Sequence, residues 1–215
     1  MAENEIAPVE ENALVLSPVL ESAAEPVVLS IADERYMKRM YNLAKFYAKS
    51  LIVPKEYRGD VAACFDACDM AARLGMPVMQ VFQNLFFVNG RPSWSGQMCI
   101  ALLNASKKYD GGEFVEVGER DTDSWGIHWQ ARRVADGKVI KGVTVTIKMV
   151  KDEGWLKNTK WTSMPEMMLK YRAAAYFART ECPEVLAGLQ MRDELDDIMP
   201  QKTVIKLGVS HGDES

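Results

Sequence analysis

Two dipeptides constrain the fold of this chain more than any other feature, because each predicts a β-hairpin. Asn89-Gly90 lies between an apolar segment at residues 85–88 and a second segment at residues 91–94. Asp136-Gly137 lies between segments at residues 125–131 and 139–147 in which apolar and polar residues alternate. Such dipeptides accept the positive φ angles of tight hairpin turns. We therefore expect one early hairpin and, with a further segment at residues 114–117, a later antiparallel meander of three or four strands.

Helical patterns surround the predicted strands. Apolar residues recur every three or four positions in several segments, and residues typical of helix ends, such as the segment Ser30-Ile-Ala-Asp33, Ser95 and Gly75, flank them. The helices are expected at about residues 33–51, 60–74, 77–83, 96–106 and 164–179. Strands and helices do not alternate regularly along the chain, which argues against a parallel sheet. The order predicts an α+β fold class, with the hairpin and the antiparallel β-meander packed with helices.

Charge divides the chain into three parts. The formal net charge is -4, yet residues 1–34 hold eight acids and no base, and residues 180–215 hold eight acids and three bases. Residues 35–179 therefore hold 23 bases and 14 acids, a net charge of +9. We expect an acidic disordered arm at residues 1–30, a folded core domain at residues 31–192, and an acidic mobile tail at residues 193–215. The basic body predicts an anionic partner such as a nucleic acid.

Several classes of protein lack their signatures in this sequence. No apolar run approaches the ~20 residues of a membrane-spanning helix, and the N-terminus lacks the basic region of a signal peptide. We therefore expect a cytoplasmic protein with no membrane contact. Four cysteines without close pairing fit buried, reduced thiols better than a zinc site. Motifs for triphosphate, dinucleotide, serine-hydrolase and zinc-protease chemistry are missing from the sequence, so we expect no enzyme, no cofactor and no metal.

The segment at residues 138–179 carries the strongest functional signal. It holds nine bases against three acids, a net charge of +6, and two tryptophans lie among the lysines. Cations bind phosphates, and exposed aromatic rings stack on the bases of single strands. On a helix, Arg172 and Arg179 share one face because they are seven residues apart, whereas Lys170 points away from Arg172. The alternative interpretation is that the tryptophans anchor the core and the lysines form a solvated edge.

Two stretches of the sequence carry a resemblance to a known family. The first runs from Leu74-Gly-Met-Pro77 through the hairpin Phe87-Val-Asn-Gly-Arg-Pro-Ser-Trp94 into a helix, and the second runs from Trp161 to Arg179. The first is similar to the Gly-Leu-Pro region, and the second to the Pro-anchored basic helix, of the RecT/Redβ family of phage single-strand annealing recombinases. With the strands between them, the resemblance covers roughly residues 35–190. It implies a RecT/Redβ-like annealing-protein core, so that residues 31–192 would form a DNA-binding and annealing core domain.

The resemblance also implies a function, partners and a site. The function is ATP-independent annealing of complementary DNA strands by a ring- or filament-forming homo-oligomer that holds single-stranded DNA and the annealed duplex intermediate. A partner exonuclease and the host single-strand binding protein are further expected partners. Two residues of the early hairpin, Arg91 and Trp94, would contribute to the DNA groove or to a subunit contact. The groove itself would be lined by Lys148, Lys151, Trp155, Lys157, Lys160, Trp161, Lys170, Arg172 and Arg179.

The sequence thus predicts a single-stranded DNA-binding and strand-annealing protein that acts in phage-type homologous recombination. One alternative is a non-annealing phage interaction module whose basic face docks an acidic protein. A metal-dependent nuclease is a third class, and the few clustered acids, such as Asp66 and Asp69, argue against it.

Overall fold

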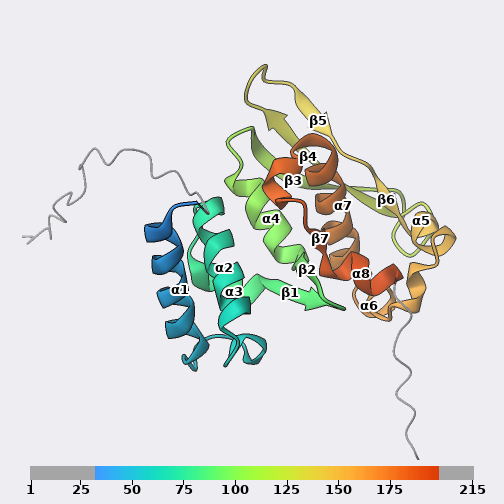
Figure 1. Cartoon of the computed structure of the whole chain (residues 1–215). Coiled ribbons are helices and arrows are strands. Elements are labelled where there is room, and N and C mark those ends of the chain that lie inside the picture. The colour runs from blue at the N-terminus through green and yellow to red at the C-terminus, as the bar shows by residue number, and fades with distance from the viewer. Residues whose placement is uncertain (1–31, 199–215) are drawn as a thin grey trace, which may run out of the picture.

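The computed structural model describes residues 32–198, and these residues form an α+β fold with two sheets (Figure 1). The smaller sheet contains β1 (Leu85–Val88), β2 (Arg91–Trp94) and β7 (Gln190–Met191), in the order β1-β2-β7. Strands β1 and β2 are antiparallel, and β7 lies parallel to β2. The larger sheet is antiparallel and contains β3 (Tyr109–Val117), β4 (Gly126–Arg133), β5 (Val139–Lys141) and β6 (Val145–Thr146). The predicted α+β class with antiparallel strands is confirmed.

The early hairpin forms as predicted, and the later one differs in part. Asn89 and Gly90 have φ angles of 50° and 78°, so both central residues of the turn between β1 and β2 lie in the left-handed region. Residues 139–147, expected to form one strand, instead form the short strands β5 and β6 and the start of a helix, α5 (Ile147–Asp152). The Thr146 hydroxyl accepts a hydrogen bond from the Met149 backbone at 3.1 Å. This cap ends the strand and begins the helix.

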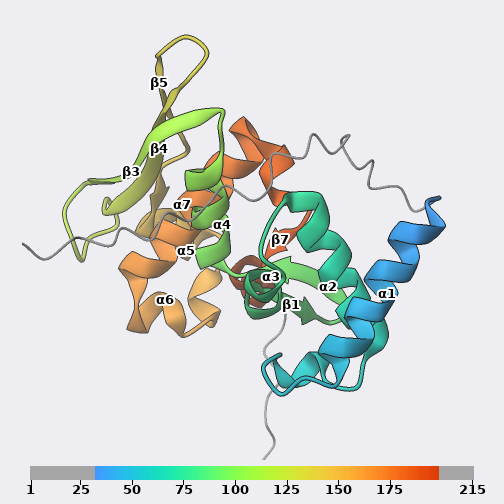
Figure 2. The same cartoon turned by 90° about the vertical axis from the view of Figure 1, so that its left-hand side faces the viewer.

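Three helices form one side of the molecule. They are α1 (Glu34–Ala48), α2 (Val61–Leu74) and α3 (Val78–Asn84), with a short 3-10 helix, η1 (Lys55–Tyr57), between the first two. The Asp33 carboxylate caps α1 by accepting from the Arg35 backbone at 2.8 Å, and Gly75, at φ 65°, ends α2. Helix α1 packs on α2 and lies far from the larger sheet in both views (Figures 1 and 2).

Two long helices connect the sheets. Helix α4 (Gly96–Ala105) begins at Ser95, whose hydroxyl accepts from the Met98 backbone at 3.0 Å, and α7 (Pro165–Glu181) lies against both α4 and β4. The approach of the two helices is close: a Cβ atom on Gly96 would lie 2.4 Å from Cγ of Tyr171. Only glycine fits at this position. The main core lies around these helices and includes Trp94, Trp129 and Phe177.

The C-terminal part of the described chain is more ordered than expected. After α5 come η2 (Trp155–Lys157) and α6 (Lys160–Ser163), and after α7 come η3 (Pro183–Leu186), β7 and α8 (Arg192–Ile198). The expected mobile tail at residues 193–215 is therefore wrong for residues 193–198, which form α8 with Leu195 fully buried. The rest of that tail, and the acidic arm expected at residues 1–30, lie outside the described residues.

Candidate nucleic-acid interface

The predicted contact residues divide into a buried and an exposed group. Trp94, Trp155, Trp161 and Arg172 are buried, with at most 6% of their surface exposed. Lys160 and Lys170 are half-buried. The exposed residues are Arg91, Lys148, Lys151, Lys157 and Arg179. A side chain must reach solvent to contact a phosphate or a base, so only the exposed and half-buried residues are available in this structure.

All three candidate tryptophans are core residues, which corrects the prediction that they face DNA. Trp155 and Trp161 stack on each other with ring centroids 5.5 Å apart and an interplanar angle of 26°. The indole Nε1 of Trp161 donates to the Asp197 carboxylate at 3.0 Å. The indole of Trp94 donates to the Leu186 carbonyl at 3.2 Å, and this contact joins the early hairpin to η3. The alternative interpretation from the sequence, that the tryptophans of residues 138–179 anchor the core, therefore describes Trp155 and Trp161 correctly.

Arg172 also has a structural role. Its guanidinium lies 3.9 Å from the centroid of the Trp155 ring and forms an ion pair with the buried Asp197 carboxylate. Asp197 also accepts a hydrogen bond from the Asn158 amide at 2.8 Å. Burial raises the pKa of Asp197, while the hydrogen bonds from Asn158 and Trp161 and the charge of Arg172 act in the opposite direction. The prediction that Arg172 contacts phosphate is therefore wrong for this conformation.

Helix α8 covers the basic face that the sequence predicted on α7. Arg179 shares that face with Arg172, as expected from their spacing, and forms an ion pair with Glu194 at 2.5 Å. Lys160 forms an ion pair with Asp193 at 3.1 Å. Carboxylates of α8 thus occupy the positions where phosphates were expected. The sequence signal for this helix is the pair of apolar residues, Leu195 and Ile198, within an acidic segment otherwise typical of a tail.

Two of the three exposed lysines, Lys148 and Lys151, form ion pairs with exposed carboxylates. Lys148 lies 2.6 Å from Asp152, and Lys151 forms an ion pair with Asp123. Lys157 forms no ion pair with any described residue. Exposed pairs of this kind contribute about 0–1 kcal/mol each. A phosphate can therefore replace these carboxylates at little cost in stability, in contrast to the buried acids beside Arg172.

A hollow beside Lys170 adds apolar surface to this region. It has a volume of about 450 Å³, and its lining includes Trp125, Met164 and Met167. Lys170 forms an ion pair with Glu166 at 2.6 Å. Both methionines are exposed, Met164 to 42% and Met167 to 47%. Apolar side chains next to cations offer a base a contact surface, which is the role the sequence assigned to the buried tryptophans.

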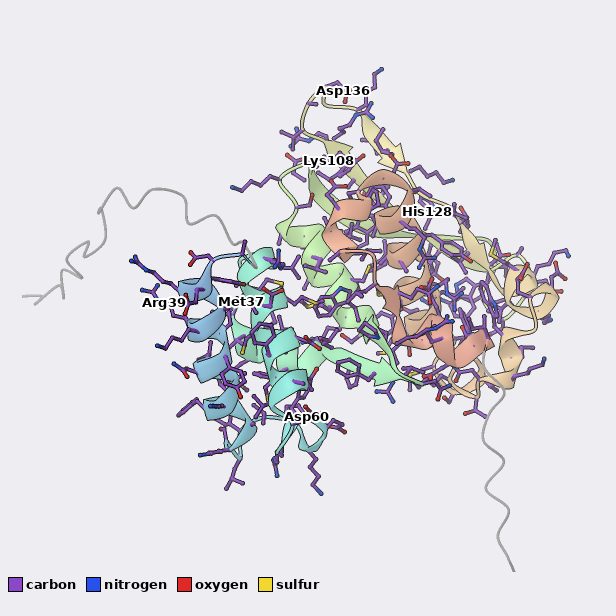
Figure 3. The ribbon with its side chains drawn as sticks, viewed as in Figure 1. Met37, Arg39, Asp60, Lys108, His128 and Asp136 are labelled. Carbon is purple, nitrogen blue, oxygen red and sulfur yellow. The ribbon has the colours of Figure 1, made fainter. Side chains whose placement is uncertain are left out.

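Among residues 32–198, the structure places one histidine, His128, and the acids apart from any metal-binding cluster. His128 is buried in β4 (Figure 3), where burial, followed by the charge of Lys141, lowers its pKa and so favours the neutral imidazole. Between residues 32 and 198, no group of three or more His, Cys, Asp and Glu side chains is placed to hold a metal ion. The same residues contain no helix that is both long and apolar enough to cross a membrane.

Comparison with known proteins does not extend this description. No protein-family model matches the chain, and neither a curated protein nor a solved structure matches it.

Proposed function

We propose that the protein binds single-stranded DNA and anneals complementary strands without ATP, as a mediator of phage-type homologous recombination. The observation that carries the proposal is the exposed lysine set of α5 and η2, namely Lys148, Lys151 and Lys157. These three cations lie within ten residues of the chain. Lys148 and Lys151 pair with exposed carboxylates, and Lys157 forms no ion pair with a described residue. Such a set can bind a phosphate backbone without any change in the core.

The packing between the two stretches that resemble RecT/Redβ proteins supports the proposal. They lie far apart in the sequence, yet α4, which follows the first, packs on α7, which forms most of the second. Gly96 permits this approach because the Tyr171 side chain occupies the space that a Cβ atom would need. The two stretches thus belong to one structural unit, as a shared function would require.

The mechanism needs no proton-transfer residue. Lysines that bind phosphates release counterions and hold the strand at its backbone, which leaves the bases free to pair. The methionine-lined hollow beside Lys170 provides an apolar surface for an unpaired base. Assembly into a ring or filament would align many such sites along a strand. An exonuclease and a host single-strand binding protein would deliver the strands.

Variants of the exposed lysines test the proposal. Lys148→Gln, Lys151→Gln and Lys157→Gln together should weaken binding of a fluorescein-labelled oligothymidine and slow annealing of complementary oligonucleotides. The slope of log affinity against log salt should become shallower by about 0.7 for each phosphate that the variant no longer neutralises, so by about 2 for three phosphates. The double variant Asp123→Asn with Asp152→Asn should bind the oligothymidine more tightly than the parent, because the carboxylates that compete for Lys148 and Lys151 are then removed.

The matched control removes three exposed cations from the far end of the larger sheet: Lys107, Arg132 and Lys138 changed to Gln. This variant should bind nearly as well as the parent. Equal losses of affinity in the two triple variants would show that the site is misplaced. A parent protein that anneals no faster than DNA alone would refute the function, and cleavage of DNA in Mg²⁺ would show a nuclease instead. Rings or filaments that appear with DNA in negative-stain images would support the proposed assembly.

A further inference from the structure

We propose that the outer face of α1 is a second surface that binds the phosphate backbone of a nucleic-acid strand. The inference rests on the proposed function, since it adds a contact surface for the same single-stranded DNA. We define the α1 face as five cations and two aromatic residues, all exposed: Arg35, Lys38, Arg39, Lys45, Lys49, Tyr41 and Phe46.

Helix geometry places these residues on one side. At 100° per residue they fall within an arc of about 160°, which also holds the exposed side chains of Glu34 and Asn42. The opposite side of the helix holds Tyr36, Ala44 and Ala48, which are buried. Arg39 points away from the rest of the molecule in Figure 3, whereas the helix itself packs against α2. The α1 face is therefore continuous, and the other described elements leave it open to a ligand.

The five cations of this face share it with one acid of α1, Glu34, so that the net charge of the face is +4. None of its five cations forms an ion pair with a residue between 32 and 198. Among the other described residues, in contrast, thirteen of the nineteen Lys and Arg side chains form one. The pattern favours a partner that supplies negative charge from outside.

Helix stability alone does not explain this arrangement of charges. Arg35 and Arg39, like Lys45 and Lys49, are like charges four residues apart, and such pairs repel each other. Arg35 also lies in the first turn, where a cation opposes the helix dipole. Lys45 and Lys49 lie near the C-terminus, where the dipole favours them. A bound polyanion would relieve the repulsion along the whole face.

The aromatic side chains point to a single strand as the ligand. Phe46 is 66% exposed and lies on the same side as Arg39 and Lys49, and Tyr41, 48% exposed, has the Lys45 ammonium 4.3 Å from its ring centroid. Exposed rings among cations are the combination that binds unpaired bases and their phosphates together. The helix is about 22 Å long, which corresponds to roughly six nucleotides at a rise of 3.4 Å.

Four substitutions test the inference: Lys38→Gln, Arg39→Gln, Lys45→Gln and Lys49→Gln in one full-length variant. Glutamine has nearly the helix propensity of lysine and arginine, and none of the four side chains is buried, so α1 should stay folded. Anisotropy with labelled oligothymidine should give a salt slope shallower by about 2.8 and an affinity lower by roughly 100-fold or more near 0.1 M salt. Circular dichroism checks the helix.

A second variant tests the aromatic contact. Phe46→Ala should lower the affinity for oligothymidine by about tenfold, within the range measured for removal of one stacked base, whereas Phe46→Tyr should retain it. Neither change should lower the midpoint of thermal unfolding appreciably, since the ring is mostly exposed. Equal affinities for Phe46→Ala and Phe46→Tyr would remove the stacking interaction from the proposal.

The outcomes separate this inference from the proposed function. The matched control changes Lys107, Arg132, Lys138 and Lys141 to Gln, with the same reduction in charge. If the parent binds DNA and the α1 variant behaves like this control, the inference is wrong while the proposed function stands. If the parent does not bind DNA, both fail. If polyglutamate displaces oligothymidine from the parent as well as unlabelled oligothymidine does, α1 is a surface for acidic proteins and the inference is overturned.

Discussion

Asp197→Ala should destabilise the fold strongly, because it removes the carboxylate that connects α8 to the core. The Asp197 side chain is fully buried, and Arg172 is 6% exposed. The change leaves the Arg172 charge without this partner and takes an acceptor from the Trp161 indole and the Asn158 amide. Breaking a buried ion pair by removal of one member costs about 3–5 kcal/mol. The loss is a large part of the ~5–15 kcal/mol that stabilises a typical domain.

Urea denaturation followed by tryptophan fluorescence measures this loss. With a slope of about 2 kcal/mol per molar urea, a cost of about 4 kcal/mol lowers the midpoint by about 2 M. Asp197→Asn should cost less, because the amide oxygen still accepts a hydrogen bond. Asp152→Ala is the control, since it breaks an exposed pair with Lys148 and should change the free energy of unfolding by no more than about 1 kcal/mol.

A double-mutant cycle shows whether the pair itself carries the effect. Arg172→Met with Asp197→Leu replaces both charges by apolar side chains and should cost clearly less than the two single changes added together. If Asp197→Ala shifts the midpoint no more than Asp152→Ala, α8 is not held by this ion pair. Arg172 would then be released from its structural role and would become a candidate phosphate ligand again.

Two further predictions concern the core. Gly96→Ala should destabilise the protein by about 1–3 kcal/mol in the same urea assay, since the Cβ atom of the new alanine would overlap the Tyr171 ring. An unchanged midpoint of urea unfolding would show that α4 and α7 are not closely packed. The four cysteines are buried, and burial raises the pKa to about 11 for Cys68 and Cys182 and to about 12 for Cys99. At pH 8 the folded protein should therefore react with Ellman's reagent only after denaturant is added. Rapid reaction of the native protein would contradict this burial.

Local signals in the sequence predict the elements whose structure depends on residues close together in the chain. The caps Asp33 and Ser95, the helix stop Gly75 and the turn Asn89-Gly90 all act through bonds or φ angles within a few residues. For this reason the five expected helices and the first hairpin lie nearly at their observed bounds, whereas α5, α6 and α8 are not among the expected helices. The first helix is the main exception, since it ends at Ala48 rather than near residue 51.

Interactions between distant residues explain the errors. Asp197 becomes part of the interior only because Arg172, Trp161 and Asn158 come together around it, and no local pattern in an acidic segment indicates this. The same packing buries Trp155, which the sequence placed among lysines and therefore near DNA. Charge and aromatic content predicted which residue types gather in this region but not which of them face solvent.

The exposed cations of the two proposed surfaces lie apart on the molecule, and their positions limit how one DNA strand could reach both. The acids of α8 neutralise Arg172 and Arg179 from within, so the +9 charge of the middle of the chain is not available at that face. The proposed binding surfaces lie instead on α1 and on α5 with η2, at opposite sides of the molecule (Figures 1 and 2). A strand that touches both must wrap around one copy or pass from one copy to the next. The second path needs no bending around a single protein, and a ring or filament of identical copies would provide it, which links the α1 surface to the proposed assembly.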